Sequence, residues 1–442
     1  MAGPATVATP GRRRARLTGV VASLTATNVL GAAFGFVTGP LLARALGASG
    51  RGDLAAVLVP LALVPGVLGL GIPAYAYREL PRGRAVEEVL GSLGLPLLLV
   101  GLLAAAGAVP VADALAGGRG PTHTFLVVGL LATPLVLLGS LLSSCLAALE
   151  RWRALVATSM IPFAGTFAAV VSLYALGDLT VATAAASTIA ASLCSLAPSL
   201  PLLASLRRPP AFRRPLARAG VAFGLKSWVG GLAQLANLRL DQLLMITVVA
   251  PRELGLYAVA TTIAGASGLA TGALSPPLMT RIARGERRLM PQAVRIVLLA
   301  TLALNAALAL ATPLLLSLLF GPQFRGAVPM AAILLAAAVP FAGASVLSSA
   351  LQADGAPLIP TVGEALALVV TVAGLLLLLS PLGGIGAALV SLAAYGASFC
   401  FQLALARRRL RVPLHAFLLP AREDAQWARS VLASVRARAR AA

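Results

Sequence analysis

Residues 358–406 read LIPTVGEALALVVTVAGLLLLLSPLGGIGAALVSLAAYGASFCFQLALA and contain a single charged side chain, that of Glu364. Because a helix needs about 20 mostly apolar residues to cross a bilayer, this stretch predicts two consecutive membrane spans, at 358–380 and 384–406. The whole chain agrees, since hydrophobic residues make up 59% of its 442 residues and charged residues only 11%. A soluble domain has about a quarter of its residues charged. The sequence therefore predicts an all-α polytopic membrane protein.

Ten more windows of similar character precede this stretch, so the expected number of spans is about twelve. They fall near 18–46, 54–77, 89–112, 124–149, 154–176, 180–205, 220–249, 254–279, 293–319 and 328–351. The window at 220–249 is the least apolar of them. The first window is much longer than the apolar core of about 7–15 residues in a signal peptide, so we expect an uncleaved first span.

Arginine is divided unevenly between the two sides of the predicted spans. With the N-terminal tail taken as the inner side, the inner segments hold 27 arginines and the outer loops hold 4. Because positive charge is retained in cytoplasmic segments, we expect both termini in the cytoplasm, at the inner membrane of a bacterium. A net charge of +21 often points to nucleic acid. Here the arginines stand in short groups between apolar runs, which indicates membrane topology, and we expect no nucleic-acid partner.

The second half of the chain repeats features of the first half. Residues of less common types recur in the same order at offsets of 203 to 206. The recurring positions are Gly52, Pro73 and Arg78 with Gly255, Pro276 and Arg281, Ser143–Ser144 with Ser348–Ser349, and Cys194 with Cys400. Six spans return a chain to the side where it began, so we expect two parallel six-helix bundles related by an axis along the membrane normal. The alternative is a chance match.

This repeat predicts four parts of the chain. We expect an N-terminal six-helix bundle at 1–205, a basic cytoplasmic linker at 206–220, a C-terminal six-helix bundle at 221–406 and a basic cytoplasmic tail at 407–442. The tail carries Trp427, Val431 and Val435 at helical spacing, which resembles an interfacial helix on anionic lipid. A disordered basic tail is the alternative.

Motifs of catalysis and metal binding are missing from the sequence. It contains no Walker A loop, HExxH or GxSxG. The cysteines, Cys145, Cys194 and Cys400, lie inside apolar windows and are expected to be buried small apolar side chains rather than disulfides or metal ligands. We therefore expect a protein that is not an enzyme, with no catalytic residue, metal or cofactor.

Charged residues inside the predicted spans are the strongest candidates for function. They are Arg44, Lys226, Arg239, Asp241 and Glu364. A charge near the bilayer centre costs at least ~2.5–3.5 kcal/mol, so such residues usually face a bundle interior or a wet cavity. Arg239 and Asp241 are two residues apart and point away from each other on a helix, so each is expected to have its own partner.

Two pairings follow from similar depth in the membrane, Asp241 with Arg44 and Glu364 with Lys226. The alternative for Arg44 and Lys226 is that they snorkel to an interface. For Asp241 and Glu364 the alternatives are coupling to an ion and a structural ion pair. The mid-span polar residues are Asn28, Gln234, Asn237 and Asn305, which would either contact a substrate or form hydrogen bonds between helices.

Four short motifs resemble a known family. The sequences LLARALG at 41–47 and GRGDL at 50–54 are similar to the first-loop pattern of Wzx-like polysaccharide flippases of the multidrug/oligosaccharidyl-lipid/polysaccharide exporter superfamily, which is MATE-like. LDQLL at 240–244 and ELGLYA at 253–258 are similar to the start of that family's second half. The resemblance covers essentially the whole chain except the tail.

The resemblance implies two six-helix bundles in a V shape around a central cavity. It also implies that a lipid-linked (polyprenyl-pyrophosphate) oligosaccharide is flipped from the inner to the outer leaflet for cell-surface polysaccharide biosynthesis. Arg44, Gly52, Asp241 and Gly255 are the positions that carry over. Membrane lipid and the lipid-linked glycan would be the partners, together with glycosyltransferases and a polymerase of the same pathway.

Physical chemistry is consistent with such a substrate. Its pyrophosphate needs cations, which Arg239, Lys226 and Arg44 can supply, and its sugars need polar groups such as those of Asn28 and Gln234. Two alternatives remain, a cation-coupled small-molecule or drug exporter of the same superfamily and a membrane glycosyltransferase or polysaccharide polymerase. The peptidoglycan-precursor flippases of the superfamily have several arginines in their first two helices. This chain has one, which argues against that subgroup.

Overall fold

The computed structural model describes residues 10–118, 120–266, 268 and 289–420, and every element in these ranges is helical. The side chains of residues 10–26, 28, 227, 229, 230 and 353 are outside the description. The chain divides into two compact units, Met1–Leu232 and Ala233–Ala442, which we call unit 1 and unit 2. The all-α fold predicted from the sequence is confirmed.

The described residues of unit 1 form ten α-helices, the last of which continues into unit 2. They are α1 (Pro10–Leu68), α2 (Ala76–Glu79), α3 (Val86–Ala106), α4 (Ala108–Ala116), α5 (Gly120–Leu131), α6 (Thr133–Ala148), α7 (Trp152–Leu176), α8 (Val181–Cys194), α9 (Leu200–Ala204) and α10 (Arg214–Val248). Within this unit α1 packs against α7 and α8, and α3 packs against α6. The core formed by these contacts is almost entirely Leu, Val and Ala, with Ile72 and Tyr75 among its larger side chains.

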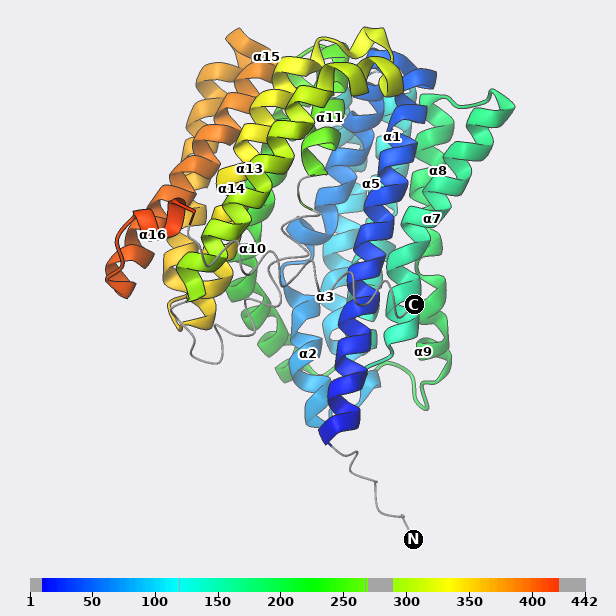
Figure 1. Ribbon diagram of the computed structural model, residues 1–442. Coiled ribbons are helices and arrows are strands. Elements are labelled where there is room, and N and C mark those ends of the chain that lie inside the picture. The colour runs from blue at the N-terminus through cyan, green and yellow to red at the C-terminus, as the bar shows by residue number, and fades with distance from the viewer. Residues whose placement is uncertain (1–9, 119, 267, 269–288, 421–442) are drawn as a thin grey trace. The chain divides into compact units, whose positions relative to one another are not determined.

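Unit 2 contains the second part of α10 and five further described helices. They are α11 (Pro251–Gly265), α13 (Leu289–Leu315), α14 (Ala327–Ala353), α15 (Leu358–Leu410) and α16 (His415–Leu418). In Figure 1, α13, α14 and α15 run side by side, and α14 contacts both of the others. The short α16 packs on α13, where Phe417 is fully buried in the core of this unit.

Two helices are far too long to be single spans. The 59 residues of α1 would measure about 88 Å as one straight helix, against a hydrocarbon thickness of about 30 Å. Both long helices, α1 and α15, consist of two helices joined at a glycine with positive φ. This glycine is Gly47 in α1, with φ of 67°, and Gly383 in α15, with φ of 53°. The predicted loop between the first two spans, residues 47–53, is therefore reduced to a break at one glycine, because glycine reaches this conformation without steric cost.

A side chain from another helix stabilises the break in α15. The carboxylate of Glu253, in the first turn of α11, accepts a hydrogen bond of 2.8 Å from the backbone N–H of Gly384. That N–H is one of the donors left without an intrahelical partner where a helix starts. A Cβ atom at Gly383 would overlap the same carboxylate. Glycine is thus required at this position for both its backbone conformation and its size.

The described residues contain seven helices long and apolar enough to cross a membrane, or eight if the bent pair α5 and α6 forms one span. Two of the seven are the broken helices α1 and α15, and α10 falls outside this set although it is 35 residues long. The predicted windows coincide with helices wherever the structure describes them. The number twelve stays a prediction, and much of the window at 254–279 lies outside the described residues.

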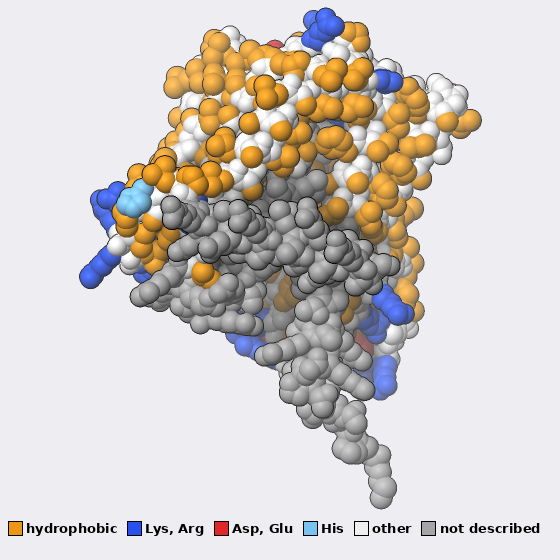
Figure 2. Space-filling view, viewed as in Figure 1, with side chains coloured by type: hydrophobic (Ala, Val, Ile, Leu, Met, Phe, Trp, Pro, Cys, Tyr) orange, Lys and Arg blue, Asp and Glu red, His pale blue; other side chains and the backbone are white. Residues whose placement is uncertain are grey.

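Apolar side chains on the outward faces indicate contact with lipid. Leu103, Leu310 and Leu376 are 74%, 85% and 75% exposed. Figure 2 shows hydrophobic side chains spread over the visible faces of the helices in each unit. The expectation that all three cysteines are buried is wrong for two of them, since Cys145 is buried but Cys194 and Cys400 are exposed. In a membrane helix an apolar side chain has no need to be buried in protein.

Candidate functional site

A network of polar side chains in unit 2 surrounds the buried Asp241 of α10. The side chain is 8% exposed. Its carboxylate accepts a short hydrogen bond from the hydroxyl of Tyr257 on α11 and another, of 2.7 Å, from the backbone N–H of Gln242. Tyr257 is itself fully buried. A buried carboxylate is costly unless it is hydrogen-bonded, so these two donors explain how α10 can hold an acid against α11.

Arg239 lies two residues before Asp241 on α10 and faces another direction. Its side chain is exposed, and its guanidinium donates a long hydrogen bond of 3.4 Å to the amide oxygen of Gln242. The amide nitrogen of Gln242 in turn lies 3.5 Å from the hydroxyl of Thr261. Among the described residues Arg239 and Asp241 form no salt bridge, as predicted from their separation of two positions. Gln242 contacts both of them, because its side chain accepts from Arg239 and its backbone N–H donates to Asp241.

Asn237 joins α10 to both helices of α15. Its amide nitrogen donates to a carboxylate oxygen of Glu364 at 3.0 Å and to the backbone carbonyl of the same residue at 3.1 Å. The hydroxyl of Tyr395, beyond the break at Gly383, donates to the carbonyl oxygen of Asn237 at 3.1 Å. The side-chain oxygen of Asn237 is buried, and no described group donates to it. The structure thus shows hydrogen bonds between helices at this residue, and its contact with a substrate stays a prediction.

The spacing on α10 explains why these groups gather. Asn237 and Asp241 are four residues apart, so they lie on one face of the helix, and both are buried. Arg239 lies between them in sequence and is exposed. One face of α10 therefore carries the polar groups that hold it to α11 and α15, and another face carries a cation.

The remaining predicted residues lie elsewhere. Arg44 is exposed in α1 just before its break, Lys226 is exposed in the unit 1 part of α10, and Gln234 is exposed in the unit 2 part. Asn28 lies in α1, but its side chain is outside the description. The proposed pairings of Asp241 with Arg44 and of Glu364 with Lys226 stay predictions. Asn305 forms a hydrogen bond between helices, since its amide donates to the carbonyl of Leu335 on α14 at 2.8 Å, and its contact with a substrate stays a prediction.

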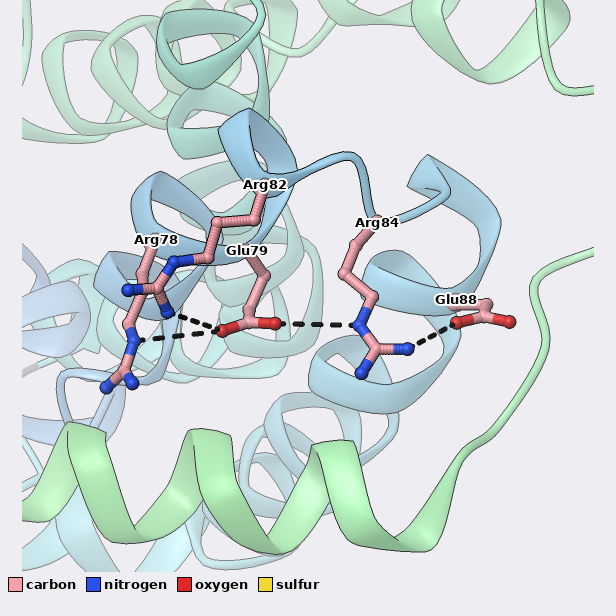
Figure 3. A network of polar contacts seen from close by, with 5 residues as sticks. All are labelled: Arg78, Glu79, Arg82, Arg84 and Glu88. Carbon is pink, nitrogen blue, oxygen red and sulfur yellow. Dashed lines mark ion pairs between the residues drawn. The ribbon is translucent and has the colours of Figure 1, made fainter.

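Unit 1 contains a second polar cluster, which the sequence reasoning missed. Figure 3 shows Glu79 at the end of α2 among three arginines, with ion pairs of 3.8, 3.5 and 3.6 Å to Arg78, Arg82 and Arg84. Arg84 also pairs with Glu88 of α3 at 3.6 Å. The Glu79 side chain is 10% exposed, whereas the three arginines are 49–59% exposed. The sequence analysis uses these arginines only to assign the sides of the membrane. The nearby acids Glu79 and Glu88 are the signal in the sequence that could have indicated the cluster.

The predicted linker at 206–220 packs closely on unit 1. The backbone N–H groups of Arg207 and Arg213 donate to the carboxylate of Glu87 at 3.1 Å and to the hydroxyl of Ser92 at 2.9 Å. Farther along, the indole of Trp228 donates to the carbonyl oxygens of Gly66 and Val67, both at 2.9 Å, where α1 ends. The first part of α10 is thereby fixed to unit 1, which accounts for the boundary between the units inside this helix.

Among the described residues no group of three or more His, Cys, Asp or Glu side chains could hold a metal ion. The polar clusters of the two units instead consist of hydrogen bonds and ion pairs.

Comparison with known proteins identifies the family of this chain. Residues 18–283, more than half of the chain, match the family described as polysaccharide biosynthesis protein. The chain belongs to this family. No curated protein matches the sequence. The identification agrees with the family resemblance of the motifs at 41–54 and 240–258.

Solved structures similar to this polysaccharide biosynthesis protein are transporters. A lipid II flippase, MurJ, in an inward closed conformation has a TM-score of 0.73 at 14% identity, with 89% of each chain covered. A multidrug resistance MATE family transporter of the MOP superfamily has a TM-score of 0.68 at 16% identity, covering 86% of this chain and 94% of its own. The MATE multidrug transporter DinF-BH has a TM-score of 0.63 at 14% identity, covering 94% of this chain and 98% of its own. The chain therefore shares its fold with these structures.

Proposed function

We propose that this protein flips a polyprenyl-pyrophosphate-linked oligosaccharide from the inner to the outer leaflet of a bacterial inner membrane. Family membership supports a role in polysaccharide biosynthesis, and the fold supports transport. The proposed partners are the lipid-linked glycan and the glycosyltransferases and polymerase that make and use it. No bond is made or broken in this proposal, so the protein needs no catalytic residue.

The observation that supports the proposal most directly is that an arginine of unit 2 is exposed, whereas the neighbouring acid is buried. Arg239 is exposed, while Asp241 is buried and bound by Tyr257 and Gln242. An accessible guanidinium with one long hydrogen bond can bind a phosphate oxygen with its other N–H groups. Arg44 and Lys226 are also exposed and are the further cations proposed to meet the pyrophosphate.

The test is the glycan lipid that accumulates without the protein. In a deletion strain, extracted lipids should contain one lipid-linked oligosaccharide in excess, and restoring the gene should remove it. Arg239→Ala should abolish export at a normal protein level, and Arg239→Lys should retain part of it because the charge remains. Arg218→Ala, which removes an exposed arginine near the start of the same helix, serves as the matched control and should leave export unchanged. Unimpaired export by Arg239→Ala would contradict the assigned role.

A cation-coupled exporter of small molecules is the second candidate function, favoured by the similarity to multidrug transporters and by the buried Asp241. For such a protein, Asp241→Asn should leave the protein level unchanged and remove the pH dependence of transport. If Asp241 is structural, the same variant should lower the protein level instead. Loss of drug resistance in the deletion strain, without any accumulated glycan lipid, would favour this candidate.

A further inference from the structure

The end of unit 2 at α15 and α16 carries a basic pocket that the proposed function does not use. Its volume is about 520 Å³, and its lining residues are Arg407, Arg408, Arg411, Val412, Pro413 and Leu414. All three arginines are exposed, and none of them forms an ion pair with a described residue. By contrast, Arg409 is bound to Asp354 at 2.8 Å. Three positive charges therefore line one hollow, and no acid of the described residues forms an ion pair with them.

The backbone holds this pocket in a fixed shape. Arg411 ends α15 in the left-handed conformation, with φ of 53°, and the N–H of Val412 returns to the carbonyl of Arg407 at 3.2 Å. The chain then turns through Pro413 into α16. That helix is anchored by the fully buried Phe417 and by the guanidinium of Arg295, which donates to the carbonyl of Ala416 at 2.5 Å. The arginines are thus presented by a packed segment.

Partly exposed apolar side chains lie beside these charges. Leu414, Leu418 and Leu419 are 41%, 39% and 61% exposed. Figure 2 shows basic, histidine and hydrophobic side chains together at the end of unit 2 that Figure 1 labels α16. Exposed leucines next to arginines are typical of a segment that lies at a membrane interface, with its cations at the level of the headgroups.

We propose that this pocket binds the headgroup of an anionic glycerophospholipid, with the phosphate held by Arg407, Arg408 and Arg411. The acyl chains of the same lipid contact the exposed leucines in and next to α16, which are Leu414, Leu418 and Leu419. The charge of the pocket selects an anionic lipid over a zwitterionic one, and the leucines select a lipid over a free phosphate. The site is separate from Arg239 and does not depend on the identity of the transported substrate.

Native mass spectrometry of the full-length protein, titrated with dioctanoylphosphatidylglycerol, tests the proposal. A basic residue near an anionic surface contributes about fivefold in affinity, so Arg407→Gln/Arg408→Gln/Arg411→Gln should lose about 100-fold. The corresponding triple Lys variant should keep most of the affinity. The matched control is Arg151→Gln/Arg153→Gln/Arg208→Gln, which removes three exposed arginines from unit 1 and should bind as the wild type does.

Two further probes separate a lipid from a bare anion. Dioctanoylphosphatidylcholine should bind much more weakly, and inorganic phosphate should not compete at equal concentration. Leu414→Ser/Leu418→Ser should weaken phosphatidylglycerol binding and leave any phosphate binding unchanged. Equal losses in the two triple Gln variants, equal binding of the two lipids, or competition by phosphate alone would each overturn the proposal.

Discussion

Replacing Tyr257 with phenylalanine removes one hydroxyl and keeps the ring that fills its site. Tyr257 is fully buried, so packing should change little, but Asp241 loses one of its two hydrogen-bond donors. A hydrogen bond to an ionised group contributes about 1.5–3 kcal/mol, and one between neutral groups about 0.5–1.5 kcal/mol. We expect the free energy of unfolding to fall by the larger amount if Asp241 is ionised and by the smaller amount if it is protonated.

The measurement is equilibrium unfolding of the full-length protein in mild detergent, titrated with a denaturing detergent. Tyr174→Phe is the matched control, since this tyrosine on α7 is 40% exposed, and its loss should be below about 0.5 kcal/mol. In an Asp241→Ala background, Tyr257→Phe should cost nothing further, because the acceptor is gone. A Tyr257→Phe protein as stable as the wild type, or an undiminished cost in the Asp241→Ala background, would refute the assignment.

Three further predictions concern the break in α15, the arginine cluster and the topology. Gly383→Ala should destabilise the protein by more than about 1 kcal/mol, because φ is positive there and the new Cβ atom would overlap Glu253. Gly396→Ala is the control, since Gly396 has open space around it and the substitution should not destabilise the protein. Equal melting temperatures of the two variants would contradict this prediction. Glu79→Gln should lower the free energy of unfolding by about 1 kcal/mol, a small amount because its arginine partners are half exposed. The variant should therefore melt at a lower temperature than the wild type, and this difference should shrink in high salt. Reporter fusions after Gly177 and Gly383 should lie outside and one after Arg214 inside; an outside signal at Arg214 would exclude the parallel-halves topology.

The sequence predicts helices well here because each span must satisfy its own backbone hydrogen bonds and cover itself with apolar side chains. Long apolar windows therefore coincide with helices such as α7 and α14. Where spans join is less predictable. The turns at Gly47 and Gly383 depend on a single backbone conformation, and the latter also needs the carboxylate of Glu253 from another helix. Apolar windows contain no information about such a partner.

The candidate site could be predicted in part for the same reason. Charges inside spans are expensive, so Asp241 and Glu364 were marked as important by their position alone. The partner of Asp241 is not predictable in this way, because Tyr257 looks like an ordinary residue of a span until the fold brings its hydroxyl to α10. Asn237, which donates to Glu364, is marked in the sequence as a polar residue inside a span but not as the partner of that acid. Glu79 was missed because its arginines lie outside the apolar windows, where charge carries no cost that would draw attention to it.

The two candidate functions differ in the charge that a ligand must reach in unit 2. A pyrophosphate-linked substrate needs an accessible cation, and an exported cation needs an accessible carboxylate. An exporter of cations needs a carboxylate that becomes accessible, yet Asp241 is covered by Tyr257, and Glu364 is bound by Asn237. Among the described residues Arg239 makes only one hydrogen bond, of 3.4 Å, so most of its donors can bind a phosphate without first breaking a strong contact. Releasing Asp241 would cost a buried hydrogen bond and would uncover a desolvated acid. Binding an anion at Arg239 requires no such rearrangement, and this asymmetry favours the pyrophosphate-linked substrate.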